Sequence, residues 1–216
     1  MNGLSKGMLW YNLRLLPKIS LIVSAASIVI IQIFFSLKMV DFRVMANIGE
    51  IFVSLLGIIL IPGLAFIEDN SGLRETVYSK AVTPVIPAAI RLVYTVIVLL
   101  LGVATFAGIA VLQESVFDEL SIIIGVFISA FIMGAAGYIM GSFTGNIALS
   151  YLVPFAYYCF EFLSKGRYTK DFYLFSLQRG YLAEEKWVLL AIGVLFIAVS
   201  LLYTGNSTRR SIFVHN

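Results

Sequence analysis

The stretch that decides the fold class of this chain runs from Leu92 to Leu112 and reads LVYTVIVLLLGVATFAGIAVL. It contains no charged residue, and it is long enough for a helix to cross a membrane, which takes about 20 apolar residues. In all, six runs approach or exceed this length: Ile19–Leu37, Ile51–Ile67, Leu92–Leu112, Leu120–Met140, Ile147–Leu163 and Trp187–Tyr203. Because the alternating pattern of a transmembrane β-strand is absent, the sequence predicts an all-α membrane protein with six transmembrane helices.

The composition excludes most soluble classes of protein. Of the 216 residues, 60% are hydrophobic and 12% are charged, whereas soluble domains are about 25% charged. The mean hydropathy is +0.98. A soluble globular domain, a disordered chain and a disulfide framework are therefore excluded. The length fits a single compact membrane domain over residues 1–216, and a net charge of +3 gives no reason to expect a nucleic-acid partner.

The residue types that most enzymatic chemistry requires are scarce. Cys159 and His215 are the single cysteine and the single histidine, so neither an internal disulfide nor most histidine chemistry is available. No phosphate-binding G-x-x-x-x-G-K-S/T motif and no H-E-x-x-H motif occur. The segment Gly141–Gly145 contains a serine but lacks the G-x-S-x-G order of a nucleophile turn. We therefore expect no catalytic residue and no metal site on this chain.

The N-terminal residues 1–18 are predicted to form an interfacial helix. Four apolar residues recur at helical spacing in this segment: Leu4, Met8, Tyr11 and Leu15. Pro17 separates them from the first apolar run. We expect residues 3–16 to lie as an amphipathic helix on the inner membrane surface, rather than to form a cleavable signal peptide. The alternative is a frayed tail.

Basic residues in the loops favour one orientation only weakly. With a cytoplasmic N-terminus, eight lysines and arginines would face the cytoplasm and seven the outside, which decides nothing by itself. The early spans favour this orientation, and so does the acidic loop with Glu114, Asp118 and Glu119. Since an even number of spans places both ends on one side, we expect both termini in the cytoplasm.

The connection over residues 68–91, EDNSGLRETVYSKAVTPVIPAAIR, carries helix signals of its own. Asn70 or Ser71 can cap a short helix over Gly72–Ala81. Such a helix would lie across the cytoplasmic base of the domain and expose three charged residues: Arg74, Glu75 and Lys80. The alternative is a solvated connector without a partner.

The fifth apolar run is rich in aromatic residues and contains an acid. Phe155, Tyr158 and Phe162 recur about one helical turn apart. Such a face either packs against other helices or lines a path for an apolar or amphipathic molecule. Glu161 either serves a function inside the membrane or reaches the interface and pairs with Lys165, four residues on.

The outer loop Ser164–Lys186 is long and contains both aromatic and charged residues. Tyr168, Phe172 and Phe175 fall on one helical face, which favours an interfacial or re-entrant helix over a plain loop with exposed aromatic residues.

Prolines and glycines mark two further features of the predicted helices. Pro62 and Pro154 lie inside the second and fifth runs and should bend those helices. The spacing Gly137-x-x-x-Gly141 allows two helices to approach closely, and we interpret it as packing within the domain.

The order of these parts, together with one group of residues, resembles a known family. The residues are Phe66–Asp69 at the end of the second run, then Gly72–Thr76, Tyr78–Lys80 and Pro84. They resemble the acidic span end, the G-x-x-E element and the S-x-P approach to the third span of permease subunits of type-2 ABC exporters. The resemblance covers nearly the whole chain, and it is nearest to bacterial exporters of drugs or peptides.

The resemblance implies a set of partners. Such permeases work as dimers, formed from two copies or from two different chains, and each protomer docks on a separate ABC ATPase subunit that binds ATP and Mg²⁺. The helix after the second span is the coupling helix, seated in a cleft of the ATPase. The ATPase-coupling residues are then Arg74, Glu75, Val77, Tyr78 and Lys80. This chain itself would carry no cofactor.

The resemblance also implies a translocation path between the second and fifth spans of two protomers. The residues we expect there are Phe52, Leu55, Ile59, Pro62, Phe155, Tyr158 and Phe162. The expected function is export of a peptide or of an amphipathic or hydrophobic compound across the bacterial plasma membrane. The main alternative is an energy-independent channel or a secondary transporter, and the third is a membrane-embedded enzyme, which the histidine count disfavours.

Overall fold

The computed structural model describes residues 10–67 and 85–214, except for the side chains of Asp171 and of residues 206–214. All regular structure in these ranges is helical. The elements are α2 (Lys18–Phe34), α3 (Phe42–Ile48), the π-helix η1 (Gly49–Val53), α4 (Leu55–Leu60), the 3-10 helix η2 (Pro62–Phe66), α7 (Val85–Leu112), α8 (Glu119–Thr144), α9 (Ile147–Ser164), the 3-10 helices η3 (Lys170–Phe172) and η4 (Ser176–Arg179), and α10 (Glu185–Val214).

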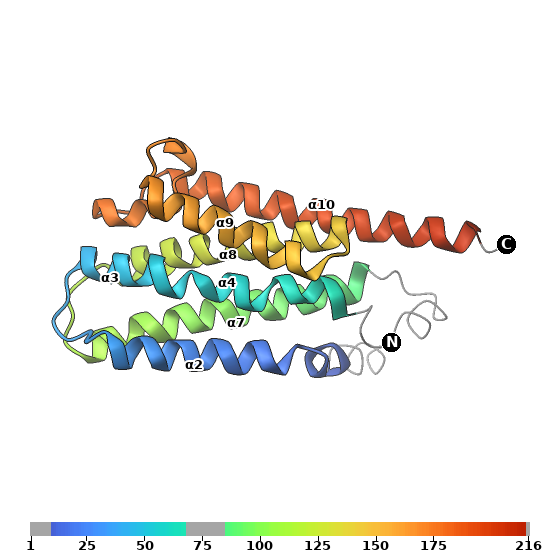
Figure 1. Ribbon diagram of the computed structural model, residues 1–216. Coiled ribbons are helices and arrows are strands. Elements are labelled where there is room, and N and C mark those ends of the chain that lie inside the picture. Colours follow the sequence, from blue (N-terminus) through green and yellow to red (C-terminus); the bar gives the residue numbers. More distant parts are fainter. Residues whose placement is uncertain (1–9, 68–84, 215–216) are drawn as a thin grey trace.

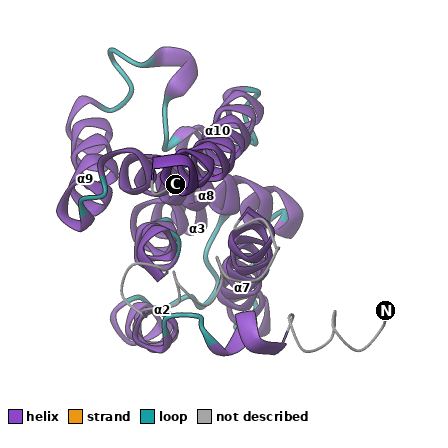
Figure 2. Cartoon of the chain, turned by 90° about the vertical axis from the view of Figure 1, so that its right-hand side faces the viewer, coloured by secondary structure: helices purple, strands orange, loops and turns teal. Residues whose placement is uncertain are grey.

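The helices form an antiparallel bundle (Figure 1). The elements α3, η1, α4 and η2 follow one another as a single rod, so the bundle consists of six rods. In the view down the bundle axis, α8 lies at the centre (Figure 2). Helices α9 and α10 pack on one side of it, and the α3–η2 rod and α7 pack on the other. Helix α2 packs on the outside of this arrangement, against α4 and α7.

Five of the rods are long and apolar enough to cross a membrane: Phe42–Phe66, α7, α8, α9 and the Glu185–Gly205 part of α10. Helix α2 is also apolar but has 17 residues. Large apolar side chains point outward along several of them, for example Ile19, Leu101 and Leu202. An outward apolar surface of this extent suits a lipid environment, so the chain is a multi-pass, membrane-embedded protein.

The second rod begins nine residues before the predicted start at Ile51. Asp41 caps it, since its side chain accepts the Val44 backbone N–H at 3.1 Å. Glu50 therefore lies inside the rod and not at its end. Helix α7 likewise starts earlier than Leu92, at Val85.

The two prolines act differently. Pro62 starts the 3-10 helix η2, so the rod changes from α to 3-10 geometry there, and Pro154 lies within α9 without ending it. At the N-terminus, residues 10–14 are helical and end before Pro17. The rest of the predicted interfacial helix, residues 1–9, lies outside the described residues, and its place at the membrane surface stays a prediction.

Small residues let α8 approach its neighbours closely. A Cβ atom on Gly137 would lie 2.5 Å from Cγ of Pro62, and one on Gly141 would lie 3.0 Å from the Phe66 ring. The interpretation of these two glycines as packing within the domain is confirmed. A Cβ on Gly134 would lie 2.8 Å from the Gly57 carbonyl oxygen. The central helix is therefore in near backbone contact with the second rod.

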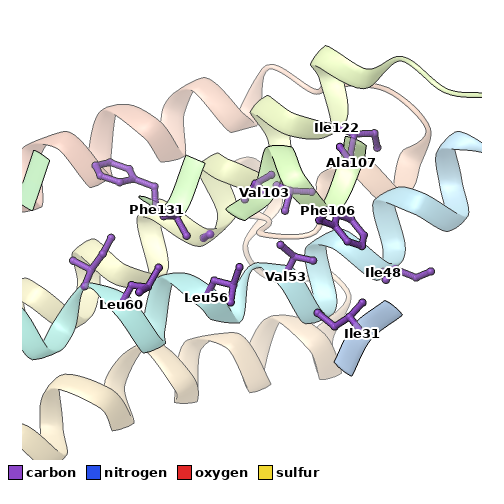
Figure 3. Packing of buried hydrophobic residues seen from close by; sticks show 14 of the residues in the cluster. Ile31, Ile48, Val53, Leu56, Leu60, Val103, Phe106, Ala107, Ile122 and Phe131 are labelled. Atoms are coloured by element: carbon purple, nitrogen blue, oxygen red, sulfur yellow. The ribbon is translucent and has the colours of Figure 1, made fainter. Parts of the chain in front are cut away.

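The main core fills the space between α2, the second rod, α7 and α8 (Figure 3). Leu56 and Phe106 are among its completely buried residues. A second cluster joins α4, α8, α9 and α10 to the chain that follows α9. This second cluster positions the site described next.

Candidate functional site

The chain between α9 and α10, residues 165–184, folds back against the bundle, and we name it the inserted segment (Figure 1, orange). Five consecutive residues of it are buried: Tyr173, Leu174, Phe175, Ser176 and Leu177. Tyr173, Leu174 and Phe175 pack with side chains from four helices, namely Ile58, Ile128, Ile132, Met133, Tyr158 and Leu189, and Leu177 belongs to the main core. The inserted segment is therefore part of the core at this end of the bundle.

This geometry differs from the single helix that the aromatic spacing of the outer loop indicated. The segment contains only the short turns η3 and η4, and Phe175 is buried whereas Tyr168 and Phe172 are exposed. The backbone explains the difference, because Gly166 and Lys170 have φ values of 72° and 43°. Left-handed residues at these positions interrupt a right-handed helix.

Polar side chains of the bundle bind the backbone of the inserted segment. The Tyr157 hydroxyl donates to the Phe172 carbonyl oxygen at 2.6 Å. Lys186 donates to the Leu174 carbonyl oxygen at 2.6 Å. Non-helical backbone at membrane depth is tolerated only where the protein satisfies its polar groups. These side chains do so for the inserted segment.

A buried ion pair lies at the centre of these contacts. The side chains of Lys186 and Glu50 are both 0% exposed, with 2.5 Å between Nζ and Oε1. Lys186 Nζ also donates to Ser129 Oγ and to the Leu174 carbonyl oxygen, each at 2.6 Å, so each of its three N–H groups has an acceptor. Glu50 Oε1 also accepts the Leu177 backbone N–H at 3.1 Å. The pair joins the second rod, α8, α10 and the inserted segment at one point.

The π-helix η1 places Glu50 at this point. The Ser54 backbone N–H bonds to the Gly49 carbonyl oxygen at 3.0 Å, five residues back, instead of the usual four. Gly49 allows η1 to lie against α8, since a Cβ there would be 2.6 Å from Cγ2 of Val126. Such π-turns are frequent at functional sites.

A second ion pair lies at the rim of the inserted segment. Arg179 and Glu185 are 2.5 Å apart and partly exposed. The hydrogen bond to Glu185 raises the pKa of Arg179, so the guanidinium stays charged, and it lies 5.8 Å from the centre of the Tyr173 ring. Burial raises the pKa of Tyr173, so its hydroxyl stays neutral.

Glu161 is the other buried acid at this site. Its side chain is 0% exposed, and Oε2 accepts a hydrogen bond from the Thr169 hydroxyl at 3.1 Å. The pairing of Glu161 with Lys165 that the spacing allowed is not formed. Lys165 has a φ of 50° and ends α9, so its exposed side chain leaves the helical face that carries Glu161.

The three aromatic residues predicted on α9 do form a row. Tyr158 lies between Phe155 and Phe162, with ring centres 6.2 and 6.4 Å apart, and the rings are nearly parallel. The edge of Phe175 from the inserted segment meets the Tyr158 ring at 5.4 Å. The Tyr158 hydroxyl donates to the Ile51 carbonyl oxygen at 2.8 Å. This aromatic row therefore connects α9 with η1 and with the inserted segment.

The four residues predicted on the second rod do not share one face with this row. Leu55 packs against the same cluster as Tyr158. Phe52 instead pairs with Phe35 at 4.8 Å, and Ile59 belongs to the main core. Pro62 is buried against Gly137 of α8. Within one copy of the chain, only Leu55 lies beside the aromatic row.

The predicted coupling residues are not part of the described structure. Arg74, Glu75, Val77, Tyr78 and Lys80 all lie in residues 68–84, outside the described ranges. Their role stays a prediction.

The sequence pattern alone does not point to Glu50 or Lys186. The predicted second span begins at Ile51, one residue after Glu50, and Lys186 is the last residue of the predicted outer loop. One signal was available for Glu50, because it is a lone acid between the apolar stretches around Met45 and Val53. Within the described residues, no three His, Cys, Asp or Glu side chains are grouped as a metal site would require.

Comparisons with family models, with curated proteins and with solved structures found no match to this chain. The class that the fold and the site define is an all-helical, multi-pass membrane protein.

Proposed function

We propose that this chain is the transmembrane permease subunit of an ATP-driven ABC exporter. The observation that supports it best is the inserted segment, held between α9 and α10 in a bundle of six antiparallel rods. This order of parts agrees with the resemblance that residues 66–84 carry in the sequence. Because the sequence carries no nucleotide-binding motif, an ATP-driven exporter built on this chain would take its energy from a separate ABC ATPase subunit.

In this proposal, α2 is the first of six membrane spans. Its 17 residues cover about 26 Å at about 1.5 Å per residue, near the lower limit of about 17 residues for a spanning helix. Six spans would put both termini on one side of the membrane. In this proposal that side is the cytoplasm of a bacterial cell, and the inserted segment lies at the outer face of the plasma membrane.

Two permease protomers would form the path, and each would bind an ATPase subunit through residues 68–91. ATP and Mg²⁺ would be bound by the ATPase, so this chain needs no cofactor of its own. The cargo class that fits an aromatic-rich path is a peptide or another amphipathic or hydrophobic compound.

The partner ATPase is the first test of this proposal. The tagged chain, extracted in mild detergent from its native cells, should co-purify with a soluble ATP-binding subunit. Tyr78→Ala should reduce recovery of that subunit more than Lys80→Ala, because a buried contact is worth more than a rim charge, typically below about 1 kcal/mol. Glu75→Lys should uncouple ATP hydrolysis from transport. If Tyr78→Ala and Glu75→Lys both assemble with the ATPase and couple hydrolysis to transport as the wild type does, these residues are not the coupling contact.

A second test concerns the aromatic row. Phe155→Ala should change export while assembly with the ATPase persists, because Phe155 is 51% exposed at the end of the row and is free to meet a cargo or a second protomer. Phe160→Ala is the matched control: Phe160 is 47% exposed on the same helix, but it lies outside the row, with its ring tilted against Tyr168 at 6.1 Å. Equal export by both variants would leave the row with a packing role only.

The alternative function is a secondary transporter, and Glu161 is the observation that favours it. Ionisable groups inside a membrane bundle often carry coupling ions. A purified chain without any ATPase, reconstituted in vesicles, would then transport in response to a proton gradient alone.

A further inference from the structure

Two completely buried carboxyl groups hold the inserted segment, and their surroundings differ. Glu50 has a cation, Lys186, at 2.5 Å. Glu161 has no cation, and its Oε2 accepts a hydrogen bond from the Thr169 hydroxyl. Each carboxyl group has one oxygen without a hydrogen-bond partner, Oε2 of Glu50 and Oε1 of Glu161. None of the ion pairs seen between described residues includes Glu161. Neutral groups, the Thr169 hydroxyl and the Leu174 backbone N–H, are therefore the compensation that this carboxyl group has.

Among the described side chains, the charged and titratable groups that face Glu161 give it no counter-charge. On α9 itself, Tyr157 directs its hydroxyl to the Phe172 carbonyl oxygen. On the inserted segment, the neutral Tyr173 faces Glu161, as does the Leu174 backbone N–H. The nearby cations are engaged elsewhere, Lys186 with Glu50 and Arg179 with Glu185.

An ionised Glu161 would be a buried charge without a counter-ion. Such a charge costs many kcal/mol, and the usual outcome in proteins is that the group takes up a proton. When protonated, the carboxyl group keeps the hydrogen bond from Thr169 and loses the uncompensated charge. The geometry of the docked segment thus fits the neutral acid.

We propose that Glu161 is a proton-binding site, occupied while the inserted segment is docked and emptied when the segment moves away and water enters. A hydrated glutamate is ionised at neutral pH, since its ordinary pKa is about 4.3. The docked form therefore binds one proton more than the released form. By linkage, raising the pH favours release, by up to about tenfold per pH unit. A proton site at Glu161 is independent of the proposed exporter function.

The protonation state is testable on the full chain in lipid nanodiscs. Infrared spectroscopy at pH 7 should show the C=O stretching band of a neutral carboxyl group, and Glu161→Gln should abolish it. Glu184→Gln, which removes an exposed carboxylate, should leave it in place. Because a variant can fail to fold, the wild-type chain is also treated with a hydrophobic carbodiimide, which reacts with neutral carboxyl groups. Mass spectrometry should find Glu161 modified and the ion-paired Glu50 unmodified.

The linkage to docking is tested by hydrogen exchange of residues 172–178. Above neutral pH, protection of these amides, corrected for intrinsic exchange, should fall by up to about tenfold per pH unit in the wild type. It should not depend on pH in Glu161→Gln, whose neutral amide cannot ionise. Absence of both the infrared band and the carbodiimide adduct would overturn the proton site. Equal pH profiles in the wild type and in Glu161→Gln would overturn its linkage to the segment.

Discussion

Replacing Lys186 with methionine should lower the free energy of unfolding by about 3–5 kcal/mol, because it leaves the Glu50 carboxylate buried without its cation. The same change removes donors from Ser129 Oγ and from the Leu174 carbonyl oxygen, which Lys186 binds at 2.6 Å each. The inserted segment would lose its central anchor. Unfolding should be followed by circular dichroism during titration of the micelles with a denaturing detergent.

The double variant Glu50→Gln/Lys186→Met distinguishes two effects on the free energy of unfolding: the destabilisation by an unpaired buried charge, and the stabilisation by the ion pair itself. Replacing a whole buried ion pair is often neutral or stabilising, so the double variant should recover most of the stability lost in Lys186→Met. Arg179→Met is the matched control, since its pair with Glu185 has side-chain exposures of 42% and 21%. It should cost below about 1 kcal/mol.

Equal losses in Lys186→Met and Arg179→Met would contradict this account. The Glu50 carboxylate would then have access to water, and the ion pair would not hold the inserted segment. A double variant less stable than Lys186→Met would also contradict it, because it would show that Glu50 stabilises the fold without its partner.

The ion pair also explains where the sequence led to a wrong helix boundary. For α7 and α8, length and apolar composition are sufficient to predict that the helices exist, because no charged residue interrupts them between Leu92 and Leu112 or between Leu120 and Met140, although α7 begins earlier, at Val85. In the second rod, the predicted apolar run begins at Ile51 and so leaves out Glu50. Its burial depends on Lys186, 136 residues further on, and no local pattern contains that information.

Helical spacing predicted part of the candidate site for a physical reason. On α9, the regular helix keeps Phe155, Tyr158 and Phe162 in one row. On the second rod, the π-turn at Gly49–Val53 and the 3-10 turn at Pro62–Phe66 change the rotation per residue. Residues spaced for a straight α-helix therefore point in different directions there. The fold of the inserted segment could not be predicted from helical spacing either. Its buried residues are consecutive in the sequence, and its turns depend on left-handed backbone angles.

Gly57→Ala should be the most damaging of the glycine-to-alanine substitutions in the bundle. A Cβ atom at Gly57 would lie 1.7 Å from the carbonyl oxygen of Ala130, an overlap with backbone that no side-chain rotation relieves. The second rod would have to move away from α8, which also opens the contact between Gly134 and the Gly57 carbonyl oxygen. Overpacking usually costs about 1–3 kcal/mol, and because backbone is involved we expect at least the upper end of that range.

Gly108→Ala provides the matched control for this prediction. Gly108 is also inside a helix, α7, but a Cβ there would have no atom within 4 Å. Alanine at this position should stabilise the helix by about 0.5–1 kcal/mol, since it removes the conformational freedom that glycine has in the unfolded chain. The two variants should therefore shift the unfolding midpoint in opposite directions in the same detergent titration. Shifts of the same sign and size would mean that α4 and α8 are not in backbone contact, and the close parallel packing of the second rod on α8 would have to be abandoned.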